Sequence, residues 1–95
     1  MKTKRKGTRI EAKVIELFEA VGFRCIRSAG SHGPFDVVGF LGPLTMLVQV
    51  KSNKKPSAEE IEEMRSWNVS CDKIKTYCVW KDREKYPVFY FEEEW

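Results

Sequence analysis

The segment at residues 44–51 constrains the fold more than any other part of this 95-residue chain. It reads LTMLVQVK, so it is apolar for most of its length and then ends with Gln49 and Lys51. An apolar run of this length predicts a strand that is buried on both faces, near the middle of a sheet. Polar side chains at the end of such a strand break the local pattern, and breaks of this kind tend to mark functional sites.

The segments around this strand predict an α/β fold. Further strands are expected at residues 23–28, 35–40, 74–80 and 87–91, and helices at residues 9–21 and 57–67. Thr8 and Glu11 have capping-box spacing at the start of the first helix, and Gly22 supplies its end. The order is αβββαβ with one extra strand, which gives a mixed central sheet flanked by helices. We predict a single domain over residues 1–95, with residues 1–7 as a mobile basic arm.

Charge is distributed unevenly along the chain. Residues 1–55 contain 11 Lys and Arg against 4 Asp and Glu, whereas residues 56–95 contain 6 against 10. A basic half is typical of a small domain that binds nucleic acid, although a solvated basic tail explains the charge equally well. The candidates for phosphate contact in the arm, the first helix and the loop after residue 51 are Lys4, Arg5, Lys6, Arg9, Lys54 and Lys55.

Several other classes of protein are disfavoured. No apolar run approaches the roughly 18 residues that span a membrane, and no signal-peptide core follows the basic N-terminus. Cys25, Cys71 and Cys78 are odd in number and lack CxxC spacing, which argues against a disulfide framework and against a zinc site. We therefore expect a cytoplasmic protein with reduced thiols and no membrane partner.

Four polar residues form a candidate site. Gln49 and Lys51 are two residues apart on a strand, so they point to the same face, and a hairpin brings Asp36 at the start of the preceding strand close to both. The Asp36 carboxylate and the Gln49 carbonyl are oxygen ligands of the kind that Mg²⁺ prefers. A bound metal ion lowers the pKa of its water, and Lys51 can orient that water or stabilise developing charge. Glu11 can complete the metal shell if its helix packs beside these strand ends.

Each of these residues also has an ordinary structural explanation. Glu11 suits the third position of a capping box, where the helix dipole favours an acid. Asp36 could cap the turn after Pro34, although aspartate is a poor residue for the interior of a strand. Lys51 could simply end a strand in solvent. Gln49 is evenly balanced between metal ligand and bystander.

Five blocks of the sequence resemble the archaeal Holliday junction resolvases, which belong to the PD-(D/E)xK nuclease superfamily. In chain order these blocks are KGTRIE at residues 6–11, GF at 22–23, RSAGS at 27–31, DVV at 36–38 and VQVK at 48–51. Their order and spacing match over about half of the chain. The RSAGS block after a helix that carries a glutamate is more specific than an isolated D…ExK pattern.

The resemblance implies a restriction-endonuclease-like αβββαβ core and a Mg²⁺-dependent endonuclease, with Mn²⁺ as an alternative ion, that resolves four-way DNA junctions as a homodimer. It implies that Glu11 and Asp36 bind the metal and that Lys51 is the catalytic lysine. The residues that it assigns to the scissile phosphate and its neighbours are Arg27, Ser28 and Ser31, and of these Ser31 joins the catalytic set.

The sequence departs from the family pattern in two ways. The glutamate of the ExK motif is replaced by Gln49, and the chain is shorter after its fourth strand than typical resolvases. Gln49 can still offer a carbonyl oxygen, so it stays among the predicted metal ligands. Two alternatives remain open: another nuclease on the same core, such as a nicking, repair or restriction enzyme, and a DNA-binding protein whose catalytic site has decayed.

Overall fold

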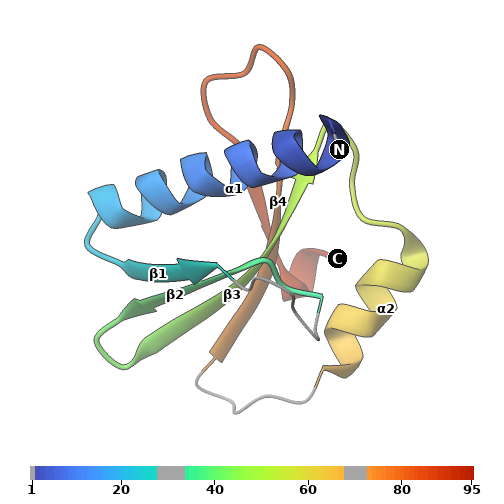
Figure 1. Ribbon diagram of the computed structural model, residues 1–95. Helices are drawn as coiled ribbons and strands as arrows, with labels where there is room; N and C mark the ends of the chain where they lie inside the picture. Colours follow the sequence, from blue (N-terminus) through green and yellow to red (C-terminus); the bar gives the residue numbers. More distant parts are fainter. Residues whose placement is uncertain (1, 28–33, 68–72) are drawn as a thin grey trace.

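The fold is a mixed five-stranded sheet with a helix packed against each face (Figure 1). The computed structural model describes residues 2–27, 34–67 and 73–95, with the backbone alone for residues 2–8. The elements are α1 (Lys2–Ala20), β1 (Arg24–Arg27), β2 (Val37–Leu41), β3 (Leu44–Ser52), α2 (Ala58–Ser66), β4 (Lys73–Trp80), β5 (Val88–Phe91) and a 3₁₀ turn at Glu92–Glu94. The predicted αβββαβ order and the extra strand are confirmed.

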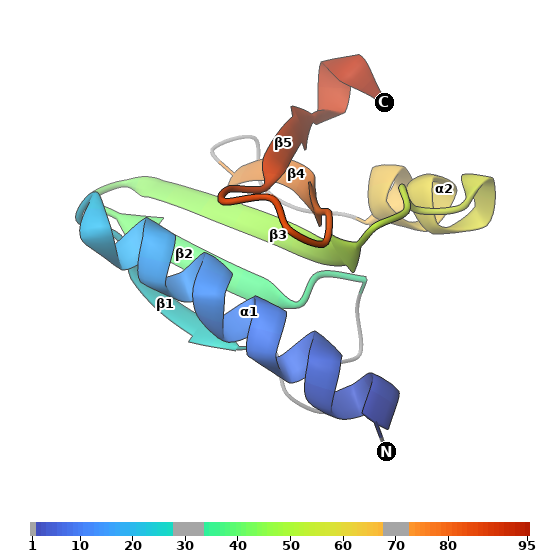
Figure 2. The same ribbon diagram turned by 90° about the horizontal axis from the view of Figure 1, so that it is seen from above.

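The strand predicted to be central, β3, lies in the middle of the sheet order β1-β2-β3-β4-β5. It forms a hairpin with β2, in which Val37 lies opposite Val48, and the turn passes through Gly42 at a φ of 58°. On its other side β3 runs parallel to β4. A parallel neighbour requires a crossover, and α2 provides it. A loop joins the end of β3 to α2 (Figure 2), and the ion pair between Lys51 and Glu60 places the start of the helix beside the candidate site.

The first face of the sheet is covered by α1. Val14 and Phe18 of this helix pack on Val37, Val48 and Cys78, all of which are buried. Gly22, at a φ of 106°, ends the helix region as predicted, because glycine adopts this backbone conformation without a steric penalty. This packing fixes the side of the sheet from which Glu11 approaches the strand ends.

The second face is covered by α2. Its fully buried Met64 packs with Leu47, Tyr77 and Val79. Leu47 belongs to the same alternating set of β3 side chains as Gln49 and Lys51, so these two polar residues also face α2. The two polar residues and Glu11 therefore approach the site from opposite faces of the sheet.

Residues 2–7, predicted as an arm ahead of the first helix, belong to that helix instead, because α1 begins at Lys2 and runs through Gly7 and Thr8 without interruption. Lysine and arginine are good helix formers, and one internal glycine costs only about 1 kcal/mol. Thr8 is therefore not an N-cap, and the capping-box explanation of Glu11 fails with it. Within the described residues, no helix is both long enough and apolar enough to span a membrane.

Candidate active site

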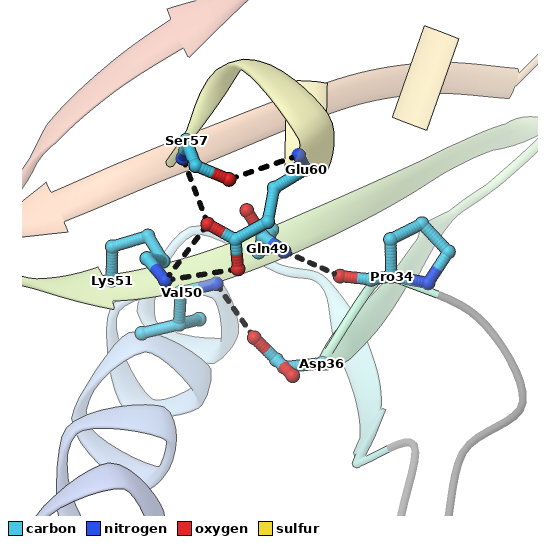
Figure 3. Close-up of polar contacts among 7 residues, drawn as sticks. All are labelled: Pro34, Asp36, Gln49, Val50, Lys51, Ser57 and Glu60. Atoms are coloured by element: carbon cyan, nitrogen blue, oxygen red, sulfur yellow. Dashed lines mark hydrogen bonds and ion pairs between the residues drawn. The ribbon is translucent and has the colours of Figure 1, made fainter. Parts of the chain in front are cut away.

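Asp36 is held against the last part of β3 by two hydrogen bonds. Its backbone N–H donates to the Val48 carbonyl at 2.8 Å. The Val50 N–H donates to its carboxylate Oδ2 at 2.9 Å (Figure 3). Asp36 precedes β2, which begins only at Val37. Its carboxylate therefore accepts the Val50 N–H, where a paired strand would offer a backbone carbonyl. The predicted proximity of Asp36 to the end of β3 is confirmed, and the carboxylate has a fixed orientation.

Gln49 lies beside Asp36 and is buried, with only 7% of its surface exposed. Its side-chain Nε2 donates to the Pro34 carbonyl at 3.1 Å. Within the described part of the chain, its Oε1 has no hydrogen-bond partner. A buried polar atom without a partner costs about 1–3 kcal/mol. The amide oxygen is therefore a buried acceptor for which the described residues supply no donor.

Lys51 forms an ion pair with Glu60 of α2 that the sequence analysis did not predict. Its Nζ lies 3.1 Å from Glu60 Oε2 and 3.3 Å from Oε1 (Figure 3). The same carboxylate accepts a hydrogen bond from the Ser57 N–H at 2.8 Å, and the Glu60 N–H donates to Ser57 Oγ at 3.1 Å. This is a complete capping box at the predicted start of the second helix. The N-terminus of α2 therefore holds the catalytic-lysine candidate.

Charge and hydrogen bonding act on Glu60 in the same direction. The Ser57 backbone N–H is the main cause that lowers the pKa of this carboxyl, and the Lys51 ammonium lowers it further, against the opposing effect of partial burial. Glu60 is therefore ionised at neutral pH, and its negative charge faces the lysine. The sequence carried one signal of this contact: a capping-box acid that lies nine residues after Lys51, across a short loop.

Glu11 reaches the site from α1. Its Oε1 lies 3.3 Å from Nε of Arg27, at the end of β1. Burial raises the pKa of Glu11, the negative charge of Asp36 raises it further, and the Arg27 guanidinium lowers it. Glu11 and Asp36 are thus close enough to repel each other. This is the arrangement that a cation placed between two carboxylates relieves.

Asp36 lies between two other acids. Burial is the largest cause that raises the pKa of Asp36 and the charge of Glu60 adds to it, whereas the Val50 N–H and Lys51 lower it. Among the residues that the structure describes, no three His, Cys, Asp or Glu side chains form a group suited to a metal ion. The donors available are the carboxylates of Glu11 and Asp36 and the unpartnered oxygen of Gln49. This set fits Mg²⁺, which takes few protein oxygens and keeps several waters.

The other predicted site residues are spread around this centre. Ser28 and Ser31 lie outside the described residues. Arg9, Lys54 and Lys55 are exposed, the first on α1 and the others in the loop between β3 and α2. The basic residues whose backbone is helical but whose side chains lie outside the described set are Lys4, Arg5 and Lys6.

The fold and the strand-end acids define the chain as a restriction-endonuclease-like α/β protein. The family model "Archaeal holliday junction resolvase (hjc)" matches residues 2–93, and the chain therefore belongs to the archaeal Holliday junction resolvase family. A structure of the Archaeoglobus fulgidus Holliday junction resolvase Hjc is similar, with 26% sequence identity and a TM-score of 0.76 over 93% of this chain and 74% of that one. Among curated proteins, no sequence matches this chain significantly.

Proposed function

We propose that this protein hydrolyses phosphodiester bonds in four-way DNA junctions with the help of a divalent metal ion, Mg²⁺ above Mn²⁺, bound at the end of β3. Family membership supports a nuclease that resolves Holliday junctions. The observation that carries the metal site is the Asp36 carboxylate, which is fixed at the end of β3 and close enough to Glu11 to raise its pKa. The unpartnered oxygen of Gln49 is a further donor on the same strand end. These features would be unfavourable in a purely structural strand end, because burial penalises a charge and an unsatisfied oxygen alike.

The residues of the site would have three different roles in the reaction. Glu11, Asp36 and Gln49 would hold the metal ion, which supplies charge neutralisation and a more acidic bound water. The Lys51 ammonium is the nearby cation that can hold the attacking water or stabilise negative charge on the phosphoryl oxygens. Glu60 is a positioning residue: it restrains the Lys51 ammonium from the side of α2, and it acts through the lysine and not on the DNA.

The function is tested by incubating the protein with labelled four-way, flap, single-stranded and duplex DNA of matched sequence. Each substrate is incubated with Mg²⁺, with Mn²⁺ and with a chelator. We expect cleavage of the four-way junction that depends on the metal and exceeds cleavage of the other substrates. Cleavage that persists in chelator would contradict the metal-dependent mechanism. Preferential cleavage of a flap or of plain duplex would favour another nuclease activity on the same core.

We also propose that two copies act together on the two-fold junction. Exposed apolar side chains support this: Ile74 of β4 is 37% exposed and Phe91 of β5 is 40% exposed. The two lie close in the antiparallel register, since Phe91 is paired with Thr76, and both line one shallow surface. Light scattering of the purified chain should give the mass of a dimer, and Phe91→Asp should shift the equilibrium toward the monomer.

Replacing Gln49 tests its role as a metal ligand. A neutral amide coordinates through oxygen but adds no Coulomb attraction, so Gln49→Glu should lower the Mg²⁺ concentration needed for half-maximal cleavage. Gln49→Ala removes the donor and should raise it. A Mg²⁺ titration of all three proteins measures the shift, and circular dichroism verifies that each variant is folded. Identical midpoints would show that Gln49 is not a ligand.

A further inference from the structure

A basic pocket lies between the N-terminal half of α1 and the loop that joins β4 to β5. It has a volume of about 240 Å³, and α1 contributes Arg9, Ile10 and Lys13 to its lining. The opposite wall is made by residues 80–84, at the end of β4 and in the loop that Figure 1 shows extending past α1. None of these residues belongs to the metal-site candidates, and only Arg9 was expected to contact DNA.

Hydrogen bonds order the loop side of the pocket and connect it to the strand that carries the active site. The Asn53 N–H donates to the Trp80 carbonyl at 3.1 Å, and the Asp82 N–H donates to the Asn53 side-chain Oδ1 at 2.8 Å. The Trp80 indole N–H donates to the Glu84 carbonyl at 2.8 Å. Asn53 follows Lys51 by two residues. The loop wall of the pocket is therefore held in place by hydrogen bonds and is connected to the end of β3 through Asn53.

The pocket concentrates positive charge that the described residues do not neutralise. Its cations are Arg9, Lys13, Lys81 and Arg83, and its acids are Asp82 and Glu84. The Lys13 ammonium lies 5.5 Å from the ring centre of Trp80, which holds it at the pocket wall. Within the described residues, Arg9, Lys81 and Arg83 form no ion pair. After the two acids are counted, an excess of two positive charges remains to attract an anion.

The backbone of Arg83 gives an independent reason to expect a ligand. This residue has a φ of 72°, in the left-handed region where a side chain is disfavoured. Such a conformation costs about 1–2 kcal/mol for a residue other than glycine. Strained positions of this kind are found preferentially at sites that bind or react. Arg83 is exposed and its side chain lines the pocket.

We propose that this pocket binds a backbone phosphate of the DNA strand as it continues past the cleavage site. A pocket of this size has room for a phosphate group. Guanidinium groups bind phosphate oxygens through paired hydrogen bonds, which suits Arg9 and Arg83. The proposal rests on the proposed function, because it takes the DNA substrate as given and adds a second contact that positions it.

Two pocket variants and one control test this proposal. Arg83→Gly removes the guanidinium and relieves the left-handed strain, and Lys81→Ala removes a second cation. Lys85→Ala is the matched control, because Lys85 is an exposed lysine of the same loop that does not line the pocket. Binding to a four-way junction is measured in chelator over a range of salt concentrations, so that cleavage does not interfere.

We expect Arg83→Gly and Lys81→Ala each to weaken junction binding about 5-fold to 10-fold and to make the slope of log K against log salt shallower by about 0.9 per lost phosphate contact. Lys85→Ala should match the wild type. The melting temperature of Arg83→Gly should be unchanged or higher, because relief of strain offsets the added freedom of glycine in the unfolded chain. Wild-type affinity and slope in both pocket variants would overturn the proposal.

A phosphate-ethylation interference experiment separates this proposal from the proposed function. On wild-type protein, ethylation of particular phosphates beside the cut should block binding, and the block should disappear at the same phosphates in Arg83→Gly and Lys81→Ala. If the wild type cleaves junctions and the variants keep the complete pattern, the pocket assignment alone is wrong. If the wild type neither binds nor cleaves four-way DNA, the proposed function fails and the pocket assignment fails with it.

Discussion

Asp36→Asn is expected to reduce junction cleavage by at least about 10³-fold, while junction binding stays as tight as in the wild type or becomes tighter. The substitution removes a negative ligand from a metal ion whose charge stabilisation is worth several kcal/mol, and each 1.36 kcal/mol is a factor of ten in rate. The asparagine Oδ1 can still accept the Val50 N–H, so the end of β3 keeps its hydrogen bond. Single-turnover cleavage and binding in chelator measure the two effects separately.

The same substitution should stabilise the fold at neutral pH. Burial, aided by the charge of Glu60, raises the folded-state pKa of Asp36 above its unfolded value. The folded chain therefore binds more protons than the unfolded chain between those two pKa values, and ionisation of Asp36 lowers stability as pH rises through this window. Asp36→Asn avoids that penalty. Its melting temperature should exceed that of the wild type at pH 7, and the difference should vanish below a pH of about 3.9, the ordinary pKa of aspartate.

Asp36→Ala is the control for both measurements. It also abolishes the metal ligand, but it leaves the Val50 N–H without its acceptor. It should be as inactive as Asp36→Asn and less stable than it. An Asp36→Asn variant that cleaves at the wild-type rate would show that the metal lies elsewhere. One that melts below the wild type at pH 7 would contradict the raised pKa.

The sheet could be predicted from the sequence because its signals are local. The apolar run of β3, the hairpin turn at Gly42 and the capping box at Ser57 each act through neighbouring residues. Alternation along a strand then placed Gln49 and Lys51 on one face, and the hairpin brought Asp36 to them. The N-terminal helix is longer than predicted: the Thr8–Glu11 spacing imitates a cap, whereas the preceding lysines and arginine have high helix propensity and extend the helix back to Lys2.

The contacts that distinguish this site from a generic one could not be predicted in the same way. The Lys51–Glu60 pair depends on where the loop after β3 places the start of α2. The register of neighbouring strands does not determine the conformation of that loop. The unpartnered oxygen of Gln49 depends on which amide atom faces the Pro34 carbonyl. The pocket beside Trp80 depends on a loop conformation with a left-handed arginine, which no propensity favours. Each is a tertiary property of side chains brought together from distant segments.

Lys51→Ala is expected to lower the cleavage rate by about 10²-fold to 10³-fold, the usual cost of losing one group that stabilises transition-state charge. Glu60→Gln should have a smaller effect, about 10-fold, because the lysine remains but its restraint is weakened. Glutamine can still accept the Ser57 N–H, so the cap of α2 and the fold should survive. Glu59→Gln is the matched control: it neutralises an exposed acid in the same helical turn without touching the Lys51–Glu60 pair.

A double substitution separates the two roles. If Glu60 acts by holding the Lys51 ammonium, Glu60→Gln should lower the single-turnover cleavage rate of the wild type but cause no further loss in the Lys51→Ala variant, whereas Glu59→Gln should change neither rate. If Glu60 serves only as a helix cap, Glu60→Gln should keep the wild-type cleavage rate and alter the melting temperature alone. A Lys51→Ala variant that cleaves at the wild-type rate would remove the lysine from the mechanism, and the positioning role of Glu60 would be removed with it.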